Sequence, residues 1–228
     1  METVRFEAAG LKCVALEPTK PGDYPLVVIL HGWGDWGESY LDIGEVIGQG
    51  ERYRFVFPTG SVPVPGALFG WFNLDMNFRD FAKRASKARP LLNSLLNELL
   101  ERYNLPASKV VLGGFSQGGM LTFEGGLRYR HNNEPLAGLI ALSSLLPADD
   151  PQSLPELEKV IAEAAQLKMP VLIAHGTYDQ VIPVQAGRAS EITLKHAGVP
   201  VTYFEFPGYH QISLEELNEI ESFLSRIL

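Results

Sequence analysis

The stretch that decides the fold reads Val110-Val111-Leu112-Gly113-Gly114-Phe115-Ser116-Gln117-Gly118-Gly119-Met120. An apolar run typical of a buried strand leads into the pattern Gly-x-Ser-x-Gly at 114–118, and a helix-forming stretch follows at 120–129. A turn this sharp strains the serine backbone, and the flanking glycines relieve the crowding of strand against helix. We therefore expect Ser116 at a helix N-terminus, above the end of a strand. The alternative is a glycine-rich turn that contains a serine by chance.

Short apolar runs recur on both sides of this stretch. They indicate buried strands at 26–30, 54–57, 139–142, 171–174 and 201–204. Helical patterns lie between them, and the clearest stripe consists of Leu91, Leu92, Leu95, Leu96, Leu99, Leu100 and Tyr103. Pro90 fits the first turn of that helix, and Ser213 with Glu216 forms a capping box at the start of the last one. Strands that alternate with helices predict a mainly parallel sheet with helices on both faces.

The N-terminal residues follow a different pattern. Polar and apolar residues alternate at 4–7 and at 12–16, with Ala9-Gly10 between them, which predicts an antiparallel hairpin with one wet face. Elsewhere no internal repeat, low-complexity tract or linker divides the sequence. We therefore expect one α/β domain over residues 1–228.

Composition excludes several classes of function. Lys and Arg number 19 against 27 Asp and Glu, a net charge of −8, and an acidic chain without a basic stripe is a poor candidate for binding nucleic acid or anionic membranes. Cys13 is the single cysteine, so no internal disulfide or thiolate cluster can form. We interpret it as a packed side chain. With no signal peptide and no apolar run long enough for membrane insertion, we expect a cytoplasmic protein. The sequence leaves a homodimer open.

A serine hydroxyl is a poor nucleophile unless a base activates it. His210 follows the apolar run at 201–206 through a short turn, and Asp179 follows the run at 171–174. The carboxyl ends of parallel strands meet at one edge of their sheet, so these side chains can lie close together. The chain order Ser, Asp, His is the order expected when the serine occupies a strand–turn–helix motif such as that of Ser116. We predict Ser116 as nucleophile, His210 as base and Asp179 as the group that orients the base. Activity should then rise between about pH 5 and pH 8, where an ordinary imidazole loses its proton.

Two backbone N–H groups are the expected donors to the oxyanion of an acyl-transfer intermediate. One belongs to Gln117, directly after the nucleophile, and the other to Trp33 in the loop 31–35. His31 and His175 each begin a His-Gly step at a strand end, and we interpret both as structural. No two histidines have a metal-ligand spacing, so we expect no metal, and the chemistry needs no cofactor.

These motifs occur together in one known family. They are Leu30-His31-Gly32-Trp33-Gly34-Asp35, Gly113-Gly114-Phe115-Ser116-Gln117-Gly118-Gly119, Leu142-Ser143-Ser144-Leu145-Leu146-Pro147, His175-Gly176-Thr177-Tyr178-Asp179 and His210-Gln211-Ile212-Ser213. From about residue 26 to 228 the chain resembles the phospholipase/carboxylesterase family, which includes acyl-protein thioesterases and small bacterial carboxylesterases. The resemblance implies an α/β-hydrolase fold without a separate cap domain, cofactor-free ester or thioester hydrolysis, and the same triad.

Three positions depart from the family pattern. Trp33 replaces a leucine, which should reshape the pocket beside the oxyanion donors. Asn73 replaces an aspartate, which puts any role of that carboxylate in doubt. Tyr209 replaces a glycine before the histidine, where its ring could crowd the entrance.

The long loop after residue 59 is rich in Gly, Pro and aromatic residues, which suggests a functional loop. The predicted substrate-binding wall consists of Trp33, Leu68, Phe69, Trp71, Phe72, Met76, Phe78 and Leu145. The alternative is that half of these aromatic side chains fill the core. A site walled in this way should prefer short to medium acyl chains. The basic residues Lys83, Arg84, Lys87 and Arg89 are interpreted as a solvated face, with steering of an anionic substrate as the alternative.

The triad alone does not separate carboxylester or thioester hydrolysis from other reactions on the same scaffold, such as lysophospholipid hydrolysis, peptide cleavage or perhydrolysis. A ligand-binding protein without catalysis is a further alternative. Such proteins usually lose a member of the triad, whereas this sequence keeps all three.

Overall fold

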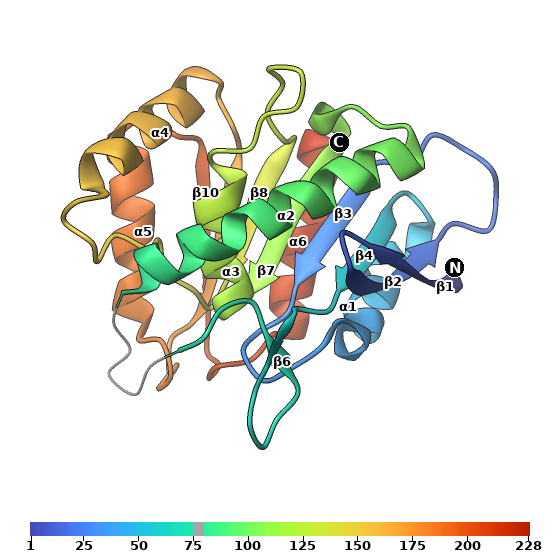
Figure 1. Cartoon of the computed structure of the whole chain (residues 1–228), viewed down its shortest axis with the longest axis horizontal. Helices are drawn as coiled ribbons and strands as arrows, with labels where there is room; N and C mark the ends of the chain where they lie inside the picture. The colour runs from blue at the N-terminus through green and yellow to red at the C-terminus, as the bar shows by residue number, and fades with distance from the viewer. Residues whose placement is uncertain (75–79) are drawn as a thin grey trace.

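The structure is a computed structural model that describes residues 1–74 and 80–228. Its centre is an eight-stranded sheet in the order β1-β2-β4-β3-β7-β8-β9-β10 (Figure 1). The hairpin of β1 (Glu2–Ala8) and β2 (Leu11–Glu17) is antiparallel, and β2 pairs in the same sense with β4 (Arg54–Pro58). All other neighbours are parallel: β3 (Leu26–Leu30), β7 (Val110–Phe115), β8 (Gly138–Leu142), β9 (Val171–Gly176) and β10 (Val201–Phe206).

Helices cover both faces of this sheet. Alternate residues of one strand serve opposite faces, so that Val27 packs with α1 (Leu41–Ile47) and α6 (Leu214–Ile227), whereas Val28 packs on the other side. That other side carries α2 (Phe81–Tyr103), α3 (Gln117–Leu121), α4 (Leu154–Gln166) and α5 (Val184–His196), and Figure 1 shows α2 and α3 in front of the sheet. Short helical turns complete the chain at η1 (Gly37–Tyr40), η2 (Gly48–Gly50), η3 (Ala107–Lys109) and η4 (Thr122–Gly126).

The predicted fold class is confirmed. Every strand expected from an apolar run is present, the sheet is mainly parallel, and the described residues show no separate cap. The capping box is also present, because Ser213 Oγ accepts from the Glu216 N–H at 3.1 Å while the Glu216 carboxylate accepts from the Ser213 N–H at 3.2 Å. Cys13 is 4% exposed, and burial raises the pKa of its thiol to about 12, as a packed side chain requires. No helix in the described part of the chain is long and apolar enough to cross a membrane.

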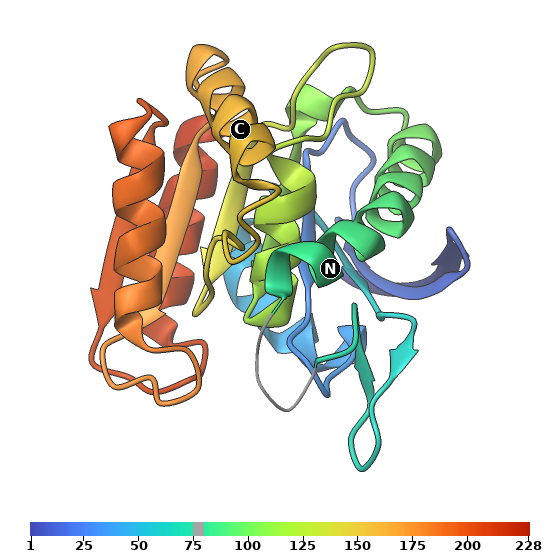
Figure 2. The same ribbon diagram turned by 60° about the vertical axis from the view of Figure 1, so that its left-hand side comes forward.

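Three local expectations were wrong. Helix α2 begins at Phe81, so Pro90 lies inside the helix and not in its first turn. The ribbon of α2 bends along its length in Figure 2, as a proline in a helix interior predicts. The helix expected at 120–129 begins earlier, at Gln117, and passes into the π-helical turn η4. Strand β2 has no wet face, because Cys13 and Val14 belong to the cores on opposite sides of the sheet.

A small hairpin of β5 (Val62–Pro63) and β6 (Phe69–Gly70) projects beyond the carboxyl ends of the parallel strands (Figures 1 and 2). Three backbone hydrogen bonds attach it to the loop after β3: from Gly34 N–H to Phe69 C=O at 2.7 Å, from Leu68 N–H to Gly34 C=O at 3.2 Å, and from Phe69 N–H to Asp35 C=O at 3.1 Å. The hairpin therefore holds the loop that carries Trp33.

Candidate active site

Ser116 lies in the sharp turn between β7 and α3, with φ 53° and ψ −115°, a strained conformation for any residue other than glycine. The turn is possible because its neighbours lack side chains. A Cβ on Gly118 would lie 2.3 Å from the Leu30 carbonyl oxygen, and one on Gly114 would lie 2.3 Å from the Gly118 backbone. Two hydrogen bonds fix the strained residue, from Ser116 N–H to Leu142 C=O and from Ser144 Oγ to Ser116 C=O, both 2.8 Å long.

Three side chains from distant loops meet beside this turn. The Ser116 hydroxyl lies 3.0 Å from His210 Nε2, and His210 Nδ1 lies 2.7 Å from Asp179 Oδ2. A carboxylate only accepts, so Nδ1 carries a proton and Nε2 is free to accept from the serine. Phe115 packs its ring 4.7 Å from the imidazole and helps to set its orientation.

Asp179 is held on both of its carboxylate oxygens. Oδ1 accepts from the backbone N–H groups of Val181 and Ile182 at 2.8 and 2.9 Å, which leaves Oδ2 for His210. His175 lies directly behind, with Nε2 2.8 Å from the Ile182 carbonyl oxygen and 3.4 Å from Asp179 Oδ2. Burial lowers the pKa of His175, so its ring stays neutral, and the bond to the Ile182 carbonyl places its proton on Nε2.

The two residues expected to donate to the oxyanion, Gln117 and Trp33, line the same cavity as Ser116. Gln117 is the first residue of α3, where the helix leaves its N–H without an acceptor. In the loop after β3, the flanking N–H groups of Gly32 and Gly34 donate to the Tyr40 hydroxyl and the Phe69 carbonyl, whereas no hydrogen bond found in residues 1–74 and 80–228 uses the Trp33 N–H. These two groups are therefore available to an oxygen bound beside Ser116.

The side chain of Gln117 has a second task, which the sequence did not reveal. Its Oε1 accepts from Trp71 N–H at 2.8 Å, and its Nε2 donates to the Phe72 carbonyl at 2.7 Å. The Trp71 indole N–H donates in turn to the His31 carbonyl at 2.8 Å, and His31 Nε2 accepts from Gly60 N–H at 2.9 Å. This network ties the long loop and the loop after β3 to the serine turn, which agrees with a structural role for His31.

A cavity of about 200 Å³ opens beside Ser116. The structure brings Trp33 and Leu145 to its wall, as expected. Most of the remaining wall was not predicted: the segment after Asp179 contributes Val181, Ile182, Pro183 and Ala186. Further apolar side chains come from Leu74, Phe81 and Met120. For Val181, Ile182 and Pro183 the sequence did carry a signal, namely three consecutive apolar residues that begin two positions after Asp179.

The other residues expected in the wall lie elsewhere, so this part of the prediction is corrected. Trp71 and Phe72 are 4% and 5% exposed and belong to the core, because the Gln117 network draws them inward. Leu68 is 43% exposed on the β5–β6 hairpin, and Phe69 lines a separate hollow with Trp36. Met76 and Phe78 lie outside the described residues.

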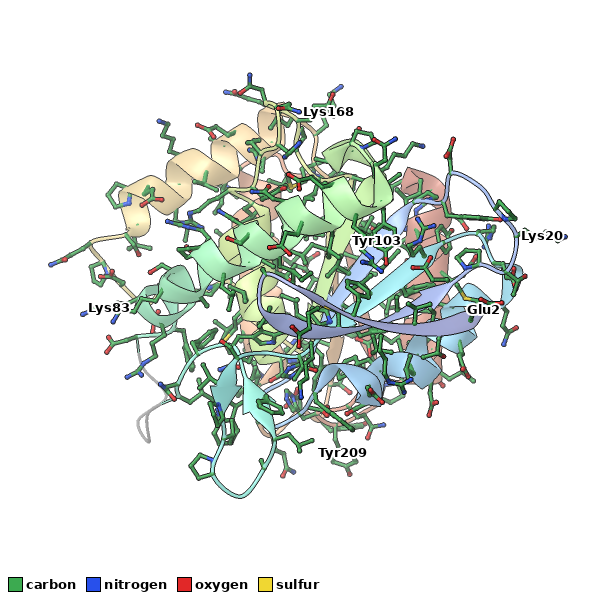
Figure 3. The ribbon with its side chains drawn as sticks, turned by 45° about the vertical axis from the view of Figure 1, so that its right-hand side comes forward. Glu2, Lys20, Lys83, Tyr103, Lys168 and Tyr209 are labelled. Carbon is green, nitrogen blue, oxygen red and sulfur yellow. The ribbon has the colours of Figure 1, made fainter. Side chains whose placement is uncertain are left out.

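The departures from the family pattern can now be placed. Trp33 is 46% exposed and forms part of the cavity wall, so it does shape the pocket. Tyr209 is 60% exposed, lies at the surface (Figure 3), and is absent from the cavity lining, with its ring 6.0 Å from that of Tyr178. Asn73 is exposed, and its carbonyl accepts from Arg84 at 3.1 Å. No described residues form a group of three metal-ligating side chains.

Comparison with known proteins identifies the family of this chain. Residues 11–228 match the phospholipase/carboxylesterase family. The chain belongs to that family. This membership, together with the α/β-hydrolase fold, makes it an ester hydrolase.

Relatives and solved structures agree with this placement. The chain is similar to acyl-protein thioesterase 1 of Neurospora crassa, with 30% identity over 89% of this chain and 86% of the relative. It is 28% identical to acyl-protein thioesterase 1 of Emericella nidulans, over 89% of this chain and 90% of the relative. The crystal structure of esterase PE8 superposes with a TM-score of 0.81 at 28% identity, covering 96% of this chain and 99% of that one.

Proposed function

We propose that the chain hydrolyses short- to medium-chain acyl esters or thioesters through a covalent acyl-enzyme, with Ser116 as nucleophile, His210 as general base and Asp179 as its orienting acid. One observation carries the proposal, the unbroken contact chain from Ser116 Oγ to His210 Nε2 at 3.0 Å and from His210 Nδ1 to Asp179 Oδ2 at 2.7 Å. These lengths lie within the reach needed for proton transfer.

In the first half-reaction, His210 Nε2 takes the hydroxyl proton while Ser116 Oγ forms a bond to the acyl carbon. The carbonyl oxygen becomes an oxyanion that accepts from the N–H groups of Gln117 and Trp33. Collapse of this intermediate breaks the bond to the leaving alcohol or thiol, which receives the proton from His210. Asp179 stabilises the imidazolium that exists between these two proton transfers.

In the second half-reaction, water takes the place of the leaving group. His210 removes a proton from the water as its oxygen attacks the acyl-enzyme, and the proton then passes to Ser116 Oγ as the acid leaves. The partly exposed position of His210, whose side chain is 17% exposed, supports access of water to its ring.

The proposed acyl group lies in the cavity beside Ser116. Its wall is mainly apolar, from Trp33, Leu145 and the segment after Asp179. An engineered cavity of roughly 150 Å³ takes up the six carbons of benzene, so about 200 Å³ corresponds to roughly eight carbons. This size supports short to medium chains, and the relatives named as acyl-protein thioesterases support thioesters beside oxygen esters. We further propose that residues 1–228 act as one domain in the cytoplasm.

The test is a series of p-nitrophenyl esters and matched acyl thioesters of four to twelve carbons, applied to the wild type and to Ser116→Ala. Loss of the nucleophile from such a triad costs about 10⁶ in kcat, so the variant should fall to background on every substrate. A variant that keeps near-normal turnover contradicts the proposal.

The same series separates the alternatives. Hydrolysis of lysophospholipids with little activity on simple esters would assign the triad to another reaction on this scaffold. Absence of turnover on every substrate, together with tight ligand binding, would identify a ligand-binding protein. Ser108→Ala, an exposed serine after α2, is the control for mutation as such.

A further inference from the structure

A second hollow lies next to the catalytic cavity and is larger, at about 430 Å³. It is bounded by the N-terminal end of α2, by the segment after β8, and by α5 at Ala189 and Thr193. Phe81, Leu145 and Ala186 line both this hollow and the cavity at Ser116. These three residues, which we call the seam, therefore border both spaces.

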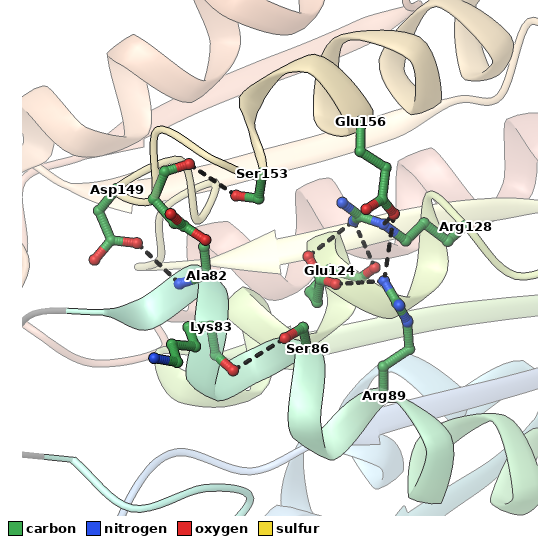
Figure 4. Close-up of polar contacts among 10 residues, drawn as sticks. Ala82, Lys83, Ser86, Arg89, Glu124, Arg128, Asp149, Ser153 and Glu156 are labelled. Carbon is green, nitrogen blue, oxygen red and sulfur yellow. Dashed lines mark hydrogen bonds and ion pairs between the residues drawn. The ribbon is translucent and has the colours of Figure 1, made fainter.

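The polar side chains along the second hollow already bond to the protein itself. Ser190 Oγ donates to the Ala186 carbonyl and accepts from Leu146 N–H, both at 2.8 Å, and Thr193 Oγ1 donates to the Ala189 carbonyl at 2.9 Å. The Asp149 carboxylate accepts from the N–H groups of Phe81 and Ala82 at 2.8 and 2.9 Å, and so caps α2 (Figure 4). With these groups satisfied, the hollow offers an apolar surface, which suits a hydrocarbon chain better than a polar ligand.

The cavity at Ser116 holds roughly eight carbons by the comparison with benzene, so a longer acyl chain must continue beyond it. We infer that acyl chains longer than this pass the seam of Phe81, Leu145 and Ala186 and lie along α5 in the second hollow. The inference rests on the proposed function, since the acyl group must be bound at Ser116 for its far end to reach the seam. It makes the enzyme competent for long as well as short chains.

Filling the second hollow tests this placement. Ala189→Trp and Thr193→Trp add bulk at two exposed positions that line the hollow but not the catalytic cavity. Ile192→Trp is the matched control, because Ile192 lies on the same helix, is 65% exposed and lines neither space. The measured quantity is the ratio of kcat/KM for the twelve-carbon p-nitrophenyl ester to that for the four-carbon ester.

Each methylene withdrawn from water is worth about fourfold in binding, so loss of two or more should lower that ratio by about tenfold or more. We expect this fall in Ala189→Trp and in Thr193→Trp, with the ratio unchanged in Ile192→Trp. An unchanged ratio in both hollow variants, or an equal fall in the control, overturns the inference while leaving the ester hydrolysis intact.

A binding measurement separates the inference from the proposed function. Calorimetric titration of Ser116→Ala with dodecanoate and with hexanoate needs no turnover. If long chains lie in the second hollow, Ala189→Trp added to Ser116→Ala should weaken the binding of dodecanoate by about tenfold and the binding of hexanoate by less than twofold. Equal affinities of the single and double variants for dodecanoate contradict the hollow, whereas failure of the wild type to hydrolyse any ester contradicts only the catalytic proposal.

Discussion

Asp179 and Glu124 are both buried carboxylates, with exposures of 7% and 4%, yet their partners differ in kind. Asp179, at the sheet edge that carries Ser116, bonds two backbone N–H groups and the ring of His210. Glu124, in the turn after α3, bonds Arg89 at 2.7 Å and Arg128 at 2.8 Å, and Arg128 also reaches the exposed Glu156 (Figure 4).

The difference decides what each carboxylate can do. A guanidinium stays charged at every physiological pH, so Glu124 and its two arginines form a fixed structural connection between α2 and η4. An imidazole gains and loses a proton near neutral pH, so Asp179 can stabilise a charge that exists only during the reaction. Burial raises the pKa of Glu124, and the arginines oppose that rise. Arg89, which the sequence suggested was part of a solvated face, is half-buried and pairs with the buried Glu124.

The largest expected effect is on catalysis. Asp179→Asn keeps the shape of the side chain but removes the charge and favours the wrong tautomer of His210, so kcat should fall by about 10⁴. The measurement is steady-state hydrolysis of the four-carbon p-nitrophenyl ester. The unfolding midpoint in urea serves as the control for structure. A fall of less than tenfold would show that Asp179 does not orient the base.

The next effect is on stability. Glu124→Gln removes the buried counter-charge of Arg128 and Arg89, whose side chains are 11% and 30% exposed, and should lower the free energy of unfolding by about 3 kcal/mol. Urea denaturation measures it, and activity per folded molecule should stay near the wild-type value. Glu156→Gln is the matched control, since Glu156 is 60% exposed and contacts the same arginines, and it should cost less than about 1 kcal/mol. Equal losses of unfolding free energy in both variants would contradict the idea that the buried Glu124 stabilises the fold more than the exposed Glu156 does.

Glu216 extends the comparison, because it is a buried carboxylate that bonds no histidine or arginine among residues 1–74 and 80–228. Its Oε2 accepts from Ser213 N–H, its Oε1 has no partner within the described part of the chain, and burial raises its pKa to about 8. The folded state thus keeps a proton that the unfolded state releases from about pH 4.5 upward, so stability falls as pH rises from there through about 8.

Glu216→Gln retains an acceptor for the capping box and does not titrate. Relative to the wild type, it should gain about 4 kcal/mol of unfolding free energy between pH 5 and pH 9, because each unit of pKa difference is worth about 1.4 kcal/mol. Urea denaturation at a series of pH values measures this gain. Parallel pH profiles for the two proteins would mean that Glu216 is already ionised in the fold.

The smallest expected effect concerns His175, which supports Asp179 from behind. A Cβ on Gly187 would lie 2.6 Å from His175 Nδ1, so the ring is closely packed as well as bonded to the Ile182 carbonyl. His175→Phe removes the bond and should lower kcat by about tenfold with KM little changed, because the acid shifts by a fraction of an ångström. His175→Gln can still donate to that carbonyl and should recover most of the loss. Equal kcat values in all three proteins would assign His175 to packing alone.

Much of this architecture was predictable because local patterns and sheet geometry agree. The apolar runs of β3, β7, β8 and β9 are buried on both faces, as inner strands of a parallel sheet must be, whereas β10 at the edge is half-buried. The loops after β7, β9 and β10 share one edge of the sheet. That edge is where Ser116, Asp179 and His210 were expected, and the structure brings their side chains within hydrogen-bonding distance.

The remainder depended on partners far away in the chain. Trp71 and Phe72 turn inward because Gln117, some 45 positions later, bonds to both of their backbones. Helix α2 starts at Phe81 because Asp149, 68 positions from that residue, accepts from its N–H and so caps the helix. Neither contact can be recognised from the neighbouring sequence. The aromatic-rich loop was therefore interpreted as a pocket wall, and Pro90 as the start of a helix.

Reaction with a fluorophosphonate tests most directly whether Ser116 is an activated nucleophile. Intact-mass spectrometry and peptide mapping should show a single adduct on Ser116 in the wild type and in Ser108→Ala. Ser116→Ala should gain none, and His210→Ala should react far more slowly. A wild type that stays unmodified, or a Ser116→Ala variant that is modified to the same extent, would contradict the account.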